Sequence, residues 1–315
     1  MIHVLTLKTI KVFALAFLIS GCAGMQSDQQ TSDRGELYDG TLAADMLGVA
    51  DASTEREALE KGDSYWLRGD GDRALLYYIR ALELNKNAHV AAMKIARVHQ
   101  QKGNKALAEQ AWRTVLAIEP DHVMALEAVG LIRLEQREYG YASDLFNQAI
   151  EQWELGLVGT ESGSGGYIPW LAVNGLGVIE DLNQNYRSAI AYYRRALVMA
   201  PGQAMLLNNL GYSYLLTGQL DQAEAYFRQA LSLRSDYPLA RHNLALVLTR
   251  RNQPNQAVRV LEPVMGEAQA RNDVGYLMML NNRLDVAEAL FREAIELSPS
   301  YYREAWQNLA RLQEG

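Results

Sequence analysis

From about residue 55 to its end the sequence repeats itself, and this periodicity limits the possible folds more than any other feature. A small residue recurs at regular intervals, and most consecutive members of the series are 34 residues apart. These marker residues are Gly62, Ala96, Gly130, Gly177, Gly211, Ala245 and Gly275. Alanine follows twelve residues after each of these markers, at Ala74, Ala108, Ala142, Ala189, Ala223, Ala257 and Ala287. A large side chain follows sixteen residues after each, as Tyr78, Trp112, Phe146, Tyr193, Phe227, Leu261 and Phe291. Small and large side chains at fixed intervals indicate a stack of similar units.

The spacing within each unit predicts two packed helices. Glycine inside a helix costs about 1 kcal/mol relative to alanine, so its recurrence indicates the close approach of a neighbouring helix. We expect the alanine twelve residues later to be the contact of each marker. Proline would end the second helix twenty-four residues after a marker, at Pro120, Pro201 and Pro299.

A tight turn between the two helices is predicted seven residues after each marker. The residues there are Gly69, Gly103, Arg137, Gln184, Gly218, Asn252 and Asn282, and five of these seven are Gly or Asn. Both residue types tolerate the left-handed conformation that closes a helix. Each unit is therefore expected to be a helix, a tight turn and a second helix.

A 34-residue helical hairpin with this signature resembles the tetratricopeptide repeat. The resemblance implies an all-α fold, a superhelical solenoid of about seven hairpins closed by a capping helix at 302–315. Units 1 to 3 are expected within 55–169 and units 4 to 7 within 170–301. The predicted units are 55–88, 89–122, 123–169, 170–203, 204–237, 238–267 and 268–301.

Two units depart from the period. The sixth is four residues short, and Pro263 falls inside its second helix, which we expect to be broken or abbreviated. The third contains an insertion near 153–170 that is rich in glycine and serine. It lacks the lysine and the strand context of a phosphate-binding loop. Two interpretations stay open: a lengthened loop at the edge of the solenoid, or a partner-binding latch that uses Trp153, Tyr167 and Trp170.

The single cysteine, Cys22, lies directly behind a short apolar run that follows two lysines, as in a secretory signal peptide. Residues 19–22, Ile-Ser-Gly-Cys, resemble the lipobox of bacterial lipoproteins. This resemblance implies that residues 1–21 are removed and that Cys22 is acylated, and Ala23 after it favours the outer membrane. Residues 22–54 are polar and are expected to form a flexible tether that spans about 30 Å. The alternative is an ordinary signal peptide with a chance cysteine.

Composition argues against several functions. The 30 basic and 37 acidic residues give a net charge of −7, and no basic run occurs, so nucleic acid is not an expected partner. The five histidines form no metal-binding motif, and we expect neither a metal nor a cofactor. No nucleophile motif is present either, so the chain is not expected to be an enzyme.

Polar and apolar side chains recur on one face of the predicted first helices in units 4 to 7. Counted from the first residue of each unit, the fifth residues are Asn174, Asn208, His242 and Asn272. The ninth residues are Val178, Tyr212, Leu246 and Tyr276. Because four residues make about one helical turn, both sets share a face. Asparagine amides can donate to and accept from a peptide backbone, so this ladder predicts a peptide-binding groove. The predicted groove comprises Asn174, Asn208, Tyr212, His242, Leu246, Asn272 and Tyr276, with Asn209 and Asn243 at sixth positions as possible substitutes.

The groove has a second interpretation, in which the polar residues are solvated and the tyrosines are partly buried between repeats.

Residues 270–309 resemble the terminal repeat and cap of TadD-type proteins of the tight-adherence pilus. Together with the lipobox, this resemblance implies a periplasmic, pilotin-like lipoprotein of the outer membrane. Its expected partner is a secretin or another pilus or secretion component, bound through an extended segment. Alternatives are an envelope scaffold that recruits peptidoglycan enzymes or proteases, and an accessory of β-barrel assembly.

Overall fold

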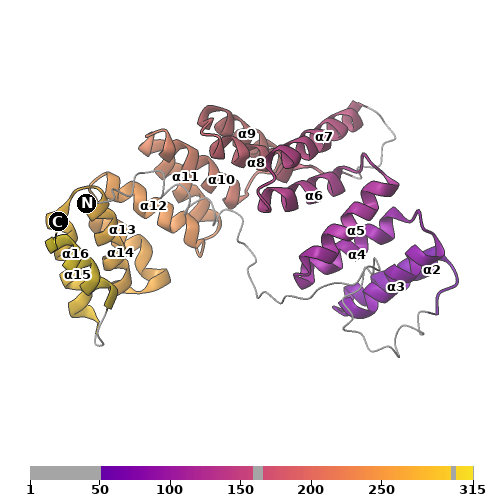
Figure 1. The fold of residues 1–315 in the computed structure, drawn as a ribbon, viewed down its shortest axis with the longest axis horizontal. Coiled ribbons are helices and arrows are strands. Elements are labelled where there is room, and N and C mark those ends of the chain that lie inside the picture. The colour runs from indigo at the N-terminus through magenta and orange to yellow at the C-terminus, as the bar shows by residue number, and fades with distance from the viewer. Residues whose placement is uncertain (1–50, 159–165, 299–302, 315) are drawn as a thin grey trace. The chain divides into compact units, whose positions relative to one another are not determined.

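The computed structural model describes residues 51–158, 166–298 and 303–314. The predicted signal peptide, Cys22 and most of the predicted tether lie outside these residues. Fifteen helices, labelled α2 to α16, account for the regular structure of the described residues (Figure 1). They are α2 (Glu55–Leu67), α3 (Gly71–Leu84), α4 (His89–Lys102), α5 (Lys105–Ile118), α6 (Val123–Glu135), α7 (Tyr139–Val158), α8 (Trp170–Leu182), α9 (Tyr186–Met199), α10 (Ala204–Leu216), α11 (Leu220–Leu233), α12 (Pro238–Arg250), α13 (Pro254–Met265), α14 (Glu267–Leu280), α15 (Leu284–Leu297) and α16 (Arg303–Glu314).

The chain forms two compact units that divide within α8, between Leu176 and Gly177. In the first unit α2 packs on α3, α4 on α5 and α6 on α7. In the second unit α10 packs on α11, α12 on α13 and α14 on α15, while α9 contacts α10 and α16 contacts α15. This arrangement confirms the predicted all-α solenoid of helical hairpins with a capping helix.

The marker glycines let an aromatic ring approach the helix backbone. A Cβ atom added at Gly130 would lie 2.6 Å from the ring of Phe146, and one at Gly211 would lie 2.8 Å from the ring of Phe227. At each marker glycine the nearest side chain is thus the large residue sixteen positions later, and not the alanine twelve positions later that we expected from the sequence. The alanines are buried beside it instead, with no exposed surface at Ala142 or Ala223.

The turn inside each hairpin follows the predicted register throughout. All seven turn positions are left-handed, with φ between 58° and 78°: Gly69, Gly103, Arg137, Gln184, Gly218, Asn252 and Asn282. Four of the seven are therefore residues with a side chain in a conformation that glycine adopts most easily. The shared geometry shows that the repeat imposes the turn even where arginine or glutamine occupies it.

The shortened sixth unit is abbreviated and not broken. Helix α13 has 12 residues, and Pro263 lies in its last turn. Gly266 alone connects it to α14, with φ 84° and ψ 162°. In the third unit, α7 has 20 residues and extends past Trp153 into the predicted insertion.

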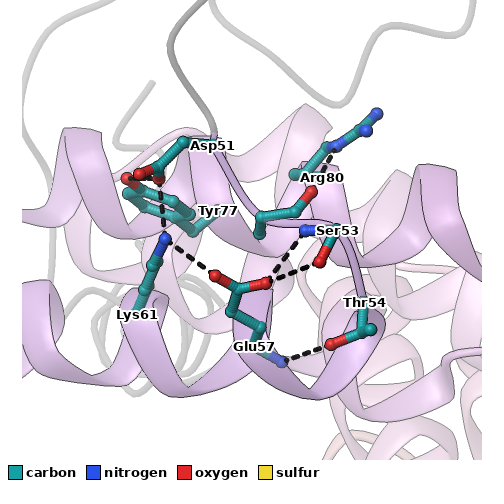
Figure 2. Close-up of polar contacts among 8 residues, drawn as sticks. Asp51, Ser53, Thr54, Glu57, Lys61, Tyr77 and Arg80 are labelled. Atoms are coloured by element: carbon teal, nitrogen blue, oxygen red, sulfur yellow. Dashed lines mark hydrogen bonds and ion pairs between the residues drawn. The ribbon is translucent and has the colours of Figure 1, made fainter.

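The start of the first repeat is fixed by polar contacts (Figure 2). Asp51 accepts hydrogen bonds from Lys61 Nζ at 2.8 Å and from the Tyr77 hydroxyl at 2.9 Å. The Thr54 hydroxyl caps α2 by accepting from the backbone N–H of Glu57 at 3.2 Å. Ala52 is buried against the same hairpin. Residues 51–54, predicted to belong to the tether, therefore pack on α2 and α3.

Candidate partner-binding surface

Two pairs of buried asparagines join neighbouring first helices in the second unit. The side-chain amide of Asn243 on α12 donates to the carboxamide oxygen of Asn208 on α10 at 2.9 Å. The amide of Asn308 on α16 donates to the oxygen of Asn272 on α14 at 3.0 Å. Asn208 has no exposed surface, and Asn272 and Asn308 are nearly as buried. Because buried amides need partners, these pairs hold successive first helices in one register.

A histidine and an aspartate occupy the equivalent positions on α12 and α14. His242 corresponds in register to Asn208, and Asp273 corresponds to Asn243. Burial raises the pKa of Asp273, while the nearby His242 and a hydrogen bond from Asn272 lower it. His242 is exposed, and its Nδ1 lies 2.7 Å from the carbonyl oxygen of Pro238.

The predicted groove residues differ in their exposure to solvent. Asn174, Asn208, Asn272 and Tyr212 are buried, whereas Leu246 and Tyr276 are partly exposed and His242 is exposed. The carboxamide oxygens of Asn208 and Asn272 accept from asparagines of later helices, so they are not presented to a ligand in this structure. Asn243, a possible substitute in the prediction, is the donor of one of these pairs. Peptide binding by this region stays a prediction.

Three rows of side chains define a surface that we call the α10–α12–α14 face. Each row contains residues four apart. Exposure increases toward the carboxyl end of α10 and α14, whereas in α12 the first member, His242, is the exposed one. The last members along each helix, Leu216, Arg250 and Leu280, are all at least partly exposed, with Leu280 at 38%. Helix α12 contacts both α10 and α14, so the three rows are neighbours. The rows are Asn208, Tyr212 and Leu216; His242, Leu246 and Arg250; and Asn272, Tyr276 and Leu280.

A buried carboxyl group anchors one edge of this face. Asp181, near the end of α8, accepts hydrogen bonds from the Tyr193 hydroxyl at 2.9 Å and from Ser213 Oγ at 2.8 Å. Burial raises the pKa of Asp181 to about 7, although both hydroxyls oppose that shift. The three residues come from α8, α9 and α10, so this cluster fixes α10 against the preceding hairpin.

A second buried carboxyl group binds the end of the insertion in the first unit. Glu127 on α6 accepts from the Tyr167 hydroxyl and from the backbone N–H of Ala172 at 2.8 Å. It thus caps the start of α8 from another helix, where the helix dipole favours a negative charge. Burial raises the pKa of Glu127 to about 7. Glu127 is the one polar residue in the otherwise apolar stretch 123–132, and this was the sequence signal for the site.

The Glu127 contact also bears on the predicted latch. The Tyr167 hydroxyl is bound inside the chain, and Trp153 and Trp170 are half-buried. In the structure Tyr167 therefore serves an internal contact, and partner binding by these three residues stays untested.

The described part of the chain contains neither a metal-binding cluster nor a helix that could cross a membrane. Residues 51–158, 166–298 and 303–314 hold no group of three or more His, Cys, Asp or Glu side chains that could hold a metal ion. None of the helices described is both long enough and apolar enough to cross a membrane.

Comparison with known proteins identifies the repeat. Models of the tetratricopeptide repeat match residues 93–155 and 181–238, and residues 214–279. These matches together cover about half of the chain. The human cell division cycle protein 16 homolog is 30% identical over 175 residues, which cover 56% of this chain and 28% of that protein. This chain therefore spans less than a third of the length of that relative.

Two solved structures share the fold. The crystal structure of PilW, described as a widely conserved type IV pilus biogenesis factor, superposes with a TM-score of 0.50 at 16% identity, covering 82% of this chain and 99% of PilW. Pseudomonas aeruginosa pilF superposes with a TM-score of 0.51 at 18% identity, covering 73% of this chain and 98% of pilF. At these identities the likeness shows a common fold.

Proposed function

This chain belongs to the tetratricopeptide repeat family, and on that basis we propose that it is a non-catalytic, protein-binding assembly factor of a pilus or secretion machine. Acylated Cys22 would hold it at the periplasmic face of the outer membrane. Its client would be a secretin or another component of the same machine, bound through an extended segment.

The observation that carries this proposal is the α10–α12–α14 face. It presents partly exposed apolar side chains from three neighbouring helices, namely Leu216, Leu246, Tyr276 and Leu280. The asparagine pairs beneath it fix the spacing of those helices. A surface that is already ordered loses little entropy when it binds, so such a face suits a segment that must itself become ordered.

Three further points support the pilus assignment. The lipobox at 19–22 and the resemblance of residues 270–309 to TadD-type proteins point to the outer membrane and to pilus assembly. A structure described as a type IV pilus biogenesis factor shares the fold over 82% of this chain.

Site-specific photo-crosslinking in living cells tests the proposal. Benzoylphenylalanine would replace Tyr276 on the face, and a matched variant would carry it at Arg259, which is exposed on α13. We expect a secretin or pilus component in the Tyr276 adduct and not in the Arg259 adduct. A peptidoglycan enzyme or protease at Tyr276 would favour the envelope scaffold instead, and the absence of any specific adduct would overturn the proposal.

The anchor has its own test. Cys22→Ser should leave the protein uncleaved or in a soluble periplasmic fraction, because no thiol remains to be acylated. A Cys22→Ser protein that is still acylated and bound to the outer membrane would contradict the lipobox assignment.

A further inference from the structure

Helix α2 begins the described array, and one of its positions differs from the equivalent position in every other repeat. In the first repeat the residue before the marker glycine is Lys61, whose side chain is 33% exposed. Its Nζ pairs with Asp51 at 2.8 Å and with Glu57 at 3.0 Å. A position that is apolar and buried between repeats is thus charged at the start of the array. The equivalent residues of the other six repeats are all buried: Ile95, Val129, Leu176, Leu210, Leu244 and Val274.

Two stacked tyrosines lie beside this lysine. Tyr65 on α2 and Tyr77 on α3 are half-buried, with ring centres 5.4 Å apart and ring planes 10° apart. Lys61 Nζ lies 5.9 Å from the centre of the Tyr77 ring. The guanidinium of Arg73 lies 5.6 Å from the centre of the Tyr65 ring, and half of its side chain is exposed. We call the surface formed by Lys61, Tyr65, Arg73 and Tyr77 the α2–α3 edge.

The fifth repeat contains the same tyrosine pair beneath a neighbouring helix. Tyr214 and Tyr226 occupy the equivalent positions and stack with ring centres 5.5 Å apart. Arg194 of α9, the second helix of the preceding hairpin, donates a hydrogen bond to the Tyr214 hydroxyl. Tyr214 is accordingly only 5% exposed. The α2–α3 edge is therefore a surface of the kind that a preceding second helix covers elsewhere in the chain.

The chain that precedes α2 leads onto this edge. From the cap residue Thr54 it runs back along α2, so that Asp51 lies at Lys61 and accepts from the Tyr77 hydroxyl at 2.9 Å (Figure 2). Ala52, between them, is 3% exposed. The chain thus enters the described structure at the α2–α3 edge.

The sequence before Asp51 fits the edge in both apolar pattern and charge. Leu42, Met46 and Val49 are four and three residues apart, which is the spacing of one apolar face of a helix. Residues 36–50 contain three acidic and no basic side chains. This charge is complementary to the guanidinium that lies over the Tyr65 ring.

We propose that residues 42–50 pack on the α2–α3 edge and cover Tyr65 and Tyr77 in place of a preceding second helix. The apolar side chains of the segment lie on the two rings, and Asp45 lies near Arg73. This packing removes apolar surface from water and closes the first end of the array, as capping elements do in repeat proteins.

One consequence concerns the predicted tether. Its freely moving part is then residues 22–41, which span about 25 Å. The inference goes beyond the proposed function, because it requires neither the acylation of Cys22 nor a client.

Single-cysteine labelling tests this inference, because Cys22 is the only cysteine of the chain. In the full chain carrying Cys22→Ser, Met46→Cys introduces one thiol in the segment, and Met25→Cys introduces one outside it as the control. The rate of reaction with a maleimide would be measured for each thiol, alone and combined with a substitution on the edge.

Two edge substitutions and one control keep the test independent of folding. Tyr65→Ala removes one ring of the stack, and circular dichroism shows whether the first hairpin still folds. Arg73→Glu reverses the charge of a half-exposed side chain outside the core. Arg113→Glu makes the same change on α5, where the arginine side chain is 58% exposed.

Each outcome decides the inference. We expect the thiol of Met46→Cys to react about tenfold more slowly than that of Met25→Cys, and to regain most of this rate with Tyr65→Ala or Arg73→Glu but not with Arg113→Glu. Equal rates for the two thiols would overturn the inference, and so would a slow Met46→Cys thiol that neither edge substitution accelerates. Slow labelling that appears only at high protein concentration would place a second copy of the chain on the edge, which also overturns it.

Discussion

The side-chain amide of Asn243 donates to the carboxamide oxygen of Asn208 at 2.9 Å, and this bond joins two first helices of successive repeats. Asn308 and Asn272 form the same bond further along the chain, at 3.0 Å. The ladder of asparagines is thus part of the packing between repeats. A client bound to the α10–α12–α14 face would meet side chains outward from it, such as Leu246 and Tyr276.

Removing one member of the pair should destabilise the second unit. Asn243→Ala leaves the carboxamide oxygen of fully buried Asn208 without its donor, which costs about 1–3 kcal/mol. Urea unfolding followed by circular dichroism measures this loss. The matched control is Asn255→Ala, because Asn255 is exposed on α13 and should change stability little. Equal stability of both variants would show that the Asn243–Asn208 bond contributes nothing.

The repeat core was predictable from sequence because its determinants are local. Seven turn positions were placed by counting from the marker residues, and all seven are left-handed. Burial of the alanines followed from the same register. The role of Asn208 was not predictable, because a helical period indicates which residues share a face but not what covers that face. Its partner lies 35 residues away, on a helix of the next unit.

The remaining contacts depend on chain paths that a period does not encode. Tyr167 donates to Glu127, which is 40 residues earlier in the chain, and the insertion before Tyr167 departs from the 34-residue period.

The marker glycines should be intolerant of a single methyl group. Gly130→Ala places a Cβ 2.6 Å from the Phe146 ring, so we expect a net loss of about 1–3 kcal/mol even though alanine favours the helix. The control is Gly140→Ala in the same hairpin, where a Cβ meets no atom within 4 Å. That change should be neutral or stabilise by up to about 1 kcal/mol. Thermal melting of the two variants checks the opposite signs, and a stable Gly130→Ala protein would contradict the close approach.

The turn at Gln184 offers a stabilising change. Its φ of 64° is costly for a residue with a Cβ atom, so Gln184→Gly should stabilise the second unit by about 0.5–1 kcal/mol. The same replacement at exposed Gln229 inside α11 should destabilise by about 1 kcal/mol, because glycine weakens a helix interior. Differential scanning calorimetry distinguishes the two. Destabilisation by both variants would show that the left-handed turn carries little strain.

Glu127 should make stability depend on pH. Its folded pKa is raised from 4.5 to about 7, so the folded state binds more protons between these values, and stability falls as pH rises through that window. Glu127→Gln keeps an acceptor and removes the charge. The free energy of unfolding of Glu127→Gln, relative to that of wild type, should therefore increase from pH 5 to pH 8. One pKa unit corresponds to roughly 1.4 kcal/mol, so the increase is at most about 3 kcal/mol. Urea unfolding across this range measures the difference, with exposed Glu151→Gln on α7 as the control. Asp181, whose pKa is also raised to about 7, is unchanged in all three proteins, so its contribution cancels. A difference between Glu127→Gln and wild type that does not vary with pH would mean that Glu127 titrates normally in the folded chain.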